Sequence, residues 1–249
     1  MMKQLLKIHL HMPKTAGTTF KSILRKNYEP NEIIDLYESF QDHEEVMNRI
    51  KSLDVAEVEW LNCHLSFGIH NYVQKPVTYI TFLRDPFDRL ISEYSFILRN
   101  PEHGLHQQVK KMSLLEYQEL EVNKNKQSKV IIGKPLSESI DMKDVEKAKE
   151  IMRKHFTFVG ITEHFTESVF LLKKEFNWYN ASYTSMNVSQ NKPDRNTISN
   201  DCLEAIRENN QIDLALYKYV KDQLDEQISI LDKRATRQLN LLLNRYKNS

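Results

Sequence analysis

Short apolar runs alternate with helix-like stretches along most of the chain. Residues 77–83 and 156–161 are apolar at nearly every position, a pattern typical of strands buried on both faces of a sheet. Residues 5–11 also indicate a short buried strand, and residues 58–64 indicate one more weakly. Apolar residues at helical spacing follow at 20–27, 86–99 and about 163–176. This alternation predicts an α/β protein with a parallel sheet covered by helices. Ligands bind such sheets at the carboxyl ends of the strands.

The segment between the second and third helical patterns is polar and rich in Lys and Glu. Residues 101–150 have helical stretches around 111–121 and 142–155, and they contain no clean linker. We interpret them as a helical insertion or lobe and not as a second domain. The expected organisation is therefore a single domain over residues 1–249.

The C-terminal part begins with an Asn-, Ser-, Thr- and Tyr-rich loop over 178–200. A helix is expected at 200–209, and a long helical stretch runs from about 211 to 246. Its apolar positions recur every three or four residues, at Leu216, Val220, Leu224, Ile228 and Leu231. We expect a long C-terminal helix that packs on the body of the protein or pairs with a second copy in a homodimer.

Composition excludes several classes of protein. With 35 Lys and Arg against 34 Asp and Glu, the net charge is +1, so the chain is not a dedicated nucleic-acid binder and any anion site must be local. Only 5 glycines argue against fibrous and linker-like chains, and 2 cysteines give no disulfide framework or zinc cluster. Without a membrane-spanning apolar run or a signal peptide, we expect a soluble cytoplasmic protein.

The loop after the first apolar run has the features of an anion site. It reads His-Met-Pro-Lys-Thr-Ala-Gly-Thr-Thr over 11–19, between a strand and the start of a helix, where unpaired N–H groups and the helix dipole favour an anion. Lys14 adds positive charge, and Gly17 lets the backbone approach a ligand closely. Hydroxyl donors come from Thr15, Thr18 and Thr19. A capped helix start with a solvated lysine is the alternative.

A second unusual segment follows the apolar run at 77–83. It reads Arg-Asp-Pro-Phe-Asp-Arg-Leu-Ile-Ser-Glu-Tyr from residue 84, and Asp85 is suited to cap the helix that follows. Ser92 lies two turns beyond that cap on the same helix face. Arg84 can bind a phosphate with two N–H groups while Ser92 donates to the same group. An ion network of Arg84, Asp85 and Arg89 is the alternative.

Together the two segments resemble the signature motifs of sulfotransferases that use 3′-phosphoadenosine 5′-phosphosulfate (PAPS). The resemblance is closest to the carbohydrate O-sulfotransferase branch that includes the heparan sulfate 2-O- and 6-O-enzymes. In that family His-x-Pro-Lys-Thr-x-Gly-Thr-Thr/Ser surrounds the 5′-phosphosulfate, and Arg-Asp-Pro-x-x-Arg-x-x-Ser-x-Tyr binds the 3′-phosphate. A weaker third match runs from Phe158 to Ser168, and the resemblance spans roughly residues 8–190. It implies a three-layer α/β/α sandwich related to P-loop nucleotide kinases.

The resemblance also implies roles for individual residues. The loop around the 5′-phosphosulfate would comprise Lys14, Thr15, Ala16, Gly17, Thr18 and Thr19, and the 3′-phosphate ligands would be Arg84 and Ser92. The family uses a general base after the second strand, often a histidine, and His64 occupies such a place. Because Cys63 stands where the family has Gly, His70 is the reserve candidate.

A late basic loop often covers the nucleotide or the acceptor in related enzymes. Ser189 and Lys192 are the candidates here, and a solvated polar loop is the alternative.

The implied reaction is transfer of a sulfuryl group from PAPS to an acceptor hydroxyl, on a saccharide or a small molecule. Such transfer proceeds by in-line displacement through a loose transition state. His64 would take the hydroxyl proton, and Lys14 would stabilise the charge on the leaving oxygen. No metal is expected, because no carboxylate pair is evident to hold one. A P-loop-like small-molecule kinase and a non-catalytic nucleotide-bisphosphate-binding protein remain the alternatives.

Overall fold

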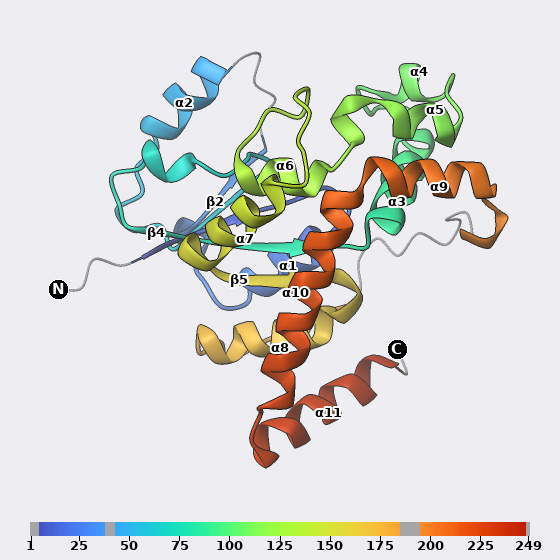
Figure 1. Ribbon diagram of the computed structural model, residues 1–249. Coiled ribbons are helices and arrows are strands. Elements are labelled where there is room, and N and C mark those ends of the chain that lie inside the picture. The colour runs from blue at the N-terminus through green and yellow to red at the C-terminus, as the bar shows by residue number, and fades with distance from the viewer. Residues whose placement is uncertain (1–4, 38–42, 185–194, 248–249) are drawn as a thin grey trace.

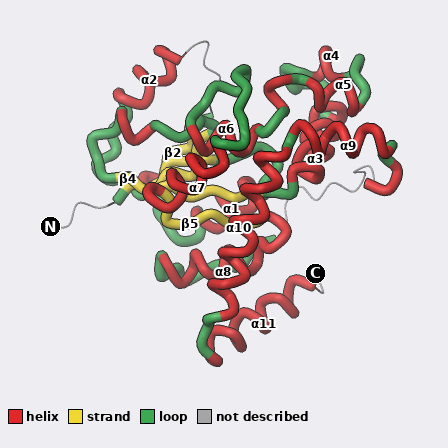
Figure 2. The backbone as a smooth tube through the Cα atoms, viewed as in Figure 1, coloured by secondary structure: helices red, strands yellow, loops and turns green. Residues whose placement is uncertain are grey.

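The computed structural model describes residues 5–37, 43–184 and 195–247. Within these ranges five parallel strands form one sheet in the order β2-β3-β1-β4-β5 (Figure 2). The strands are β1 (Leu6–Leu10), β2 (Ile33–Leu36), β3 (Trp60–Cys63), β4 (Val77–Leu83) and β5 (Phe156–Ile161). The central strand β1 lies between β3 and β4, so the strands that follow it in the chain are added on both sides of it. A ligand crevice is expected at the carboxyl end of β1, where the strand order reverses.

Eleven α-helices lie in the described part of the chain (Figure 1). They are α1 (Gly17–Leu24), α2 (His43–Lys51), α3 (Pro86–Arg99), α4 (His106–Val109), α5 (Leu114–Glu119), α6 (Lys126–Ile132), α7 (Asp144–His155), α8 (Phe165–Glu175), α9 (Asn200–Asn209), α10 (Gln211–Ser229) and α11 (Lys233–Lys247). Short 3₁₀ turns occur at Pro30–Glu32, Ile69–Asn71, Glu121–Asn123, Thr162–His164 and Arg195–Thr197.

The helices cover both faces of the sheet, which confirms the predicted α/β class. On one face Phe20 of α1 packs with Trp60 and Phe82, and α8 adds Val169 and Leu172. The opposite face is packed by Ile50 of α2 and by partly buried residues of the segment 65–73; its strand residues are Leu6, Ile8, Leu10, Leu61, Cys63 and Tyr79. Helices α3, α4, α5 and α9 form a lobe beside the sheet (Figure 1).

The sequence predicts the position of strands that are buried on both faces. It does not predict the edge strand β2. The strands expected at 77–83 and 156–161 have the same bounds in the structure, because continuous apolar runs leave little choice. Strand β2 and helix α2 were not expected. The four residues of β2 include three that are half-buried or exposed, so no apolar run marks this strand.

The expectation of one long helix over 211–246 is wrong, because the chain turns between Ser229 and Lys233. Asp232 starts a new helix after this turn, because its Oδ1 accepts the N–H of Ala235 at 2.8 Å as an N-terminal cap. Helix α11 then packs against α8, with Ala235 and Leu239 on Phe170.

Helix α10 packs on the body of the protein. Leu216, Val220 and Leu224 are almost fully buried in the main core, and α10 contacts β5, α6, α7 and α3. The apolar side chains of α10 were expected to pack either on the body of the protein or on a second copy. The structure shows that they pack on the body of the same chain. These side chains are not free to pair with a second copy.

Helices α6 and α10 cap each other at their N-termini. Asp213 of α10 accepts the N–H groups of Gln127 and Ser128 at 3.1 and 2.7 Å. In return, Asn125 Oδ1 accepts the N–H groups of Ile212 and Asp213 at 2.9 and 3.1 Å. This exchange satisfies N–H groups that a helix start leaves unpaired, and it joins the segment 101–150 to the C-terminal helices.

We expect Asp213→Ala to lower the free energy of unfolding by about 2–4 kcal/mol. The carboxylate is 1% exposed, so its loss leaves buried N–H groups and the Ser128 hydroxyl without their acceptor. Urea unfolding followed by circular dichroism measures the change. Asp222→Ala is the matched control on the same helix, because its carboxylate is 58% exposed and its hydrogen bond is to the exposed Lys218. Equal losses in both variants would contradict the capping role.

Candidate active site

The carboxyl ends of β1, β3 and β4 bring the two unusual segments together. The loop 11–19 follows β1, His64 follows β3, and Arg84 follows β4. Arg84 Nη1 donates to the carbonyl oxygen of Lys14 at 3.0 Å, although the two residues are 70 positions apart. The site expected from the sequence is therefore assembled at one edge of the sheet.

The loop between β1 and α1 has an unusual backbone. Lys14 and Ala16 have φ angles of 69° and 63°, in the left-handed region that non-glycine residues seldom occupy. Backbone of this kind is costly and clusters at ligand sites, where turned N–H groups form a concave anion-binding nest. The first bond of the helix runs from the Phe20 N–H to the Ala16 carbonyl at 3.0 Å.

Thr15 does not have the role that the sequence suggested for its hydroxyl. The side chain is fully buried, and its hydroxyl donates to the carbonyl of Met12 at 2.9 Å. This hydrogen bond links Thr15 to the start of the loop. Thr18 is exposed and Thr19 is buried at the start of α1.

Gly17 is required by a side chain of the same loop. A Cβ atom at this position would lie 1.9 Å from Nε2 of His11 and 2.0 Å from its Cδ2. The imidazole of His11 therefore packs directly on the first residue of α1. The sequence predicts that Gly17 allows close approach of a ligand, whereas the contact with His11 depends on how the loop folds.

His64 belongs to a cluster of polar rings. Its Nε2 lies 3.1 Å from Nδ1 of His11, and the same nitrogen of His11 lies 3.1 Å from the hydroxyl of Tyr37. The rings of Tyr37 and His64 are 4.5 Å apart in edge contact. Tyr37 comes from the loop after β2, the strand that the sequence did not reveal.

A chain of hydrogen bonds that runs from buried His9 to exposed Arg25 supports this cluster. The ring of His9 stacks on that of His11 at 5.3 Å, and His9 Nδ1 lies 3.1 Å from Asn62 Oδ1. Asn62 donates to Asp35 at 2.9 Å, and Asp35 pairs with Arg25. These residues lie on β1, β2 and β3, so the pairing of the strands positions the histidines.

All three histidines are neutral near pH 7. Burial, followed by the charges of Lys21 and Lys126, lowers the pKa of His64 to about 4, while Glu93 opposes this shift. Burial also lowers the pKa of His9 to about 3 and that of His11 to about 2. A neutral imidazole has a lone pair that can accept a proton, which is the property a general base needs.

Lys14 is partly withdrawn from solvent. Its ammonium lies 4.2 Å from the ring centre of Phe96 on α3. Burial, and then the charges of Arg84 and Arg99, lower the pKa of Lys14. The concentration of positive charge around this lysine favours an anionic ligand.

The backbone of Arg84 is held by hydrogen bonds, and its guanidinium lies close to the loop 11–19. Gln127 of α6 binds the Arg84 N–H and carbonyl, each at 2.9 Å. Glu163, from the third stretch matched in the sequence, approaches Arg84 Nε at 3.8 Å, and that nitrogen is buried without a hydrogen-bond partner among the described residues.

Among the described residues, Arg84, Asp85 and Arg89 do not form the ion network that was the alternative interpretation of this segment. Asp85 caps α3 by accepting the N–H of Asp88 at 3.1 Å, as the sequence predicted. Arg89 is 1% exposed and pairs with Glu93 at 2.7 Å, and Lys126 pairs with the same carboxylate at 2.8 Å. Burial alone would raise the pKa of Glu93, but Lys126 and Arg89 lower it to about 2.

The remaining candidates are a buried serine of α3, a histidine of another aromatic group and two residues outside the described ranges. Ser92 is 4% exposed on α3, one residue before Glu93. His70 contacts the Tyr79 hydroxyl at 2.8 Å and stacks on His155, in an aromatic group away from His11. Ser189 and Lys192 fall outside the described residues.

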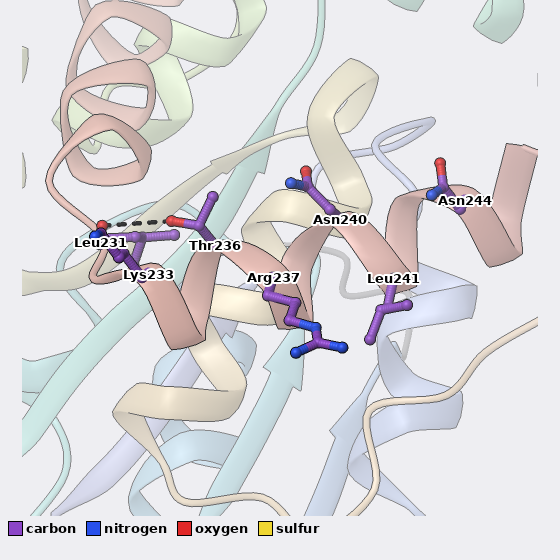
Figure 3. A pocket seen from close by; sticks show the side chains of 7 residues that line it. All are labelled: Leu231, Lys233, Thr236, Arg237, Asn240, Leu241 and Asn244. Atoms are coloured by element: carbon purple, nitrogen blue, oxygen red, sulfur yellow. Dashed lines mark hydrogen bonds between the residues drawn. The ribbon is translucent and has the colours of Figure 1, made fainter.

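Within 5–37, 43–184 and 195–247, no three His, Cys, Asp or Glu side chains gather as a metal site would require. In the same ranges, none of the helices has the length and apolar character needed to cross a membrane. A separate shallow pocket on α11, lined by residues such as Arg237 and Asn240, lies away from the strand ends (Figure 3).

A parallel sheet with an anion loop after its central strand defines a P-loop-like α/β protein. A family model described as the sulfotransferase family matches residues 7–220. The chain therefore belongs to the sulfotransferase family, as the two motifs predicted. No curated protein matches the chain. Among solved structures, mouse sulfotransferase SULT7A1 complexed with PAP is similar, with 15% identity, coverage of 98% of this chain and 85% of that chain, and a TM-score of 0.43.

Proposed function

We propose that this protein transfers the sulfuryl group of PAPS to a hydroxyl group of an acceptor, and that the acceptor is a saccharide. The observation that carries the proposal is the meeting of the strained Lys14–Ala16 loop, Arg84 and the neutral His64 at one edge of the sheet. The saccharide rests on the sequence resemblance alone.

The loop and Arg84 suit the two anionic ends of the donor. Backbone N–H groups from Ala16 to Thr19 would hold the 5′-phosphosulfate at the start of α1. The guanidinium of Arg84, whose buried Nε has no hydrogen-bond partner among the described residues, would bind the 3′-phosphate together with Ser92.

The chemical step needs one proton acceptor and one stabilising cation. The acceptor hydroxyl oxygen attacks sulfur, its proton passes to His64, and the bond from sulfur to the 5′-phosphate oxygen breaks. Lys14 stabilises the charge that remains on that oxygen. Burial lowers the pKa of His64 to about 4, so its imidazole is unprotonated and has a free lone pair at physiological pH.

The kinase and binding-only alternatives are distinguished by direct assays. A thermal-shift experiment with adenosine 3′,5′-bisphosphate tests for the donor site, with 5′-monophosphate and Mg²⁺–ATP as comparisons. A saccharide and small-alcohol panel with sulfur-labelled PAPS tests for transfer. Stabilisation by Mg²⁺–ATP alone would favour the kinase, and bisphosphate binding without transfer to any acceptor would favour a binding protein.

We expect Arg84→Ala to weaken binding of adenosine 3′,5′-bisphosphate by about tenfold to a hundredfold, because a charge-assisted phosphate contact is lost. Binding of the 5′-monophosphate should hardly change. Isothermal titration with both ligands measures the difference. Gln127 binds the backbone N–H and carbonyl of residue 84, so these two hydrogen bonds survive the substitution. Equal weakening for both ligands would show that the arginine is structural.

A further inference from the structure

His11 is the residue of the loop that contacts the proposed base, and no role has been given to it. Its Nδ1 lies 3.1 Å from His64 Nε2 and 3.1 Å from the hydroxyl of Tyr37. Its ring lies flat against two neighbours, Gly17 on the helix start and His9 on the strand. The position of the ring is therefore fixed by packing, and its polar edge faces His64.

The position of the protons follows from what His64 must do. If His11 Nδ1 donated to His64 Nε2, the lone pair at that nitrogen would be occupied and the proton of neutral His64 would sit on Nδ1. No nitrogen would then be free to act as a base. In the opposite arrangement His64 Nε2–H donates to His11 Nδ1, and the lone pair of His64 is free on Nδ1.

The hydroxyl of Tyr37 is compatible with the second arrangement. Tyr37 keeps its proton, because burial and then the charge of Asp35 raise its pKa, so its hydroxyl can also donate to the lone pair of His11. With Nδ1 as acceptor, the proton of neutral His11 lies on Nε2, against Gly17 at the start of α1.

We propose that His11 is a positioning residue, whose Nδ1 accepts the N–H of His64, fixes the tautomer of the base and stabilises the imidazolium formed when the base takes a proton. This inference rests on the proposed function. The groups that also face His64 are Lys21 of α1, Lys126 of α6 and Glu93 of α3, and these act on its charge but not on its tautomer.

Two substitutions separate this role from simple packing. His11→Phe keeps a flat ring against Gly17 and His9 but has no acceptor, and we expect kcat to fall at least tenfold with KM and bisphosphate affinity unchanged. His11→Asn restores an acceptor oxygen near the place of Nδ1, and it should recover most of that loss. His155→Phe, the same ring exchange in the distant aromatic group around Phe67, should leave kcat unchanged. Equal defects in His11→Phe and His11→Asn, or a normal kcat in His11→Phe, would overturn the proposal.

A spectroscopic measurement tests the same point without any turnover. In ¹⁵N NMR spectra at pH 6–8, His64 of the wild type should show a protonated Nε2 and an unprotonated Nδ1. In His11→Phe the two tautomers should be mixed. A wild-type His64 protonated on Nδ1 refutes the inference whether or not the protein transfers sulfate. Conversely, absence of transfer with the expected tautomer refutes the proposed function alone.

Discussion

We expect His64→Ala to lower the rate of sulfuryl transfer by about 100-fold or more, because general base catalysis contributes roughly that factor. The affinity for adenosine 3′,5′-bisphosphate should remain close to that of the wild type, since the proposed anion contacts come from the loop 11–19 and from Arg84. Single-turnover transfer of labelled sulfate measures the rate, and thermal shift measures binding.

The pH dependence gives this experiment a second readout. A base works only when unprotonated, and burial lowers the pKa of His64 to about 4, so the wild-type rate should be flat from about pH 6 to 8 and fall as the pH falls through about 4. The residual rate of His64→Ala should lack this acid limb. His70→Ala is the matched comparison, because His70 is a histidine partnered by Tyr79. If His70→Ala loses activity and His64→Ala does not, the base is His70.

We expect Gly17→Val to abolish detectable binding of the bisphosphate in a protein that still folds. The added Cβ would lie within 2.0 Å of two atoms of His11, so the histidine ring or the loop must move. Either movement disrupts the backbone nest at Lys14 and Ala16, and a displaced His11 also leaves the proposed base without its partner.

Gly104→Val is the control for this substitution. A Cβ at residue 104 would meet no described atom within 4 Å, so binding should persist. Circular dichroism and a cooperative melt show whether each variant is folded. Bisphosphate binding by a folded Gly17→Val protein with the wild-type affinity would show that the anion site lies elsewhere.

The sequence predicted those features of the fold that depend on residues close together in the chain. The strands 77–83 and 156–161 and the cap at Asp85 agree with the structure because each depends on residues within a few positions. The meeting of Lys14 with Arg84 follows from strand order, since parallel strands end at one edge.

The features that were missed depend on contacts between distant residues. Tyr37 reaches His11 only because β2 pairs with β3, and β2 has no apolar run to reveal it. His11 was part of a quoted motif, but its partner His64 lies 53 residues away. The turn at Asp232 is a single capping residue inside a continuous helical pattern, so periodicity could not reveal it.

The exchange of caps between α6 and α10 has a consequence for synthesis on the ribosome. Gln127 holds the backbone of Arg84, and Asp213 caps the helix that carries Gln127. Chains emerge from their N-terminus, so both signature motifs are outside the ribosome long before residue 213. A nascent chain therefore contains both motifs while the helix behind Arg84 is still uncapped. The support of the Arg84 backbone becomes complete only after residue 213 has been made.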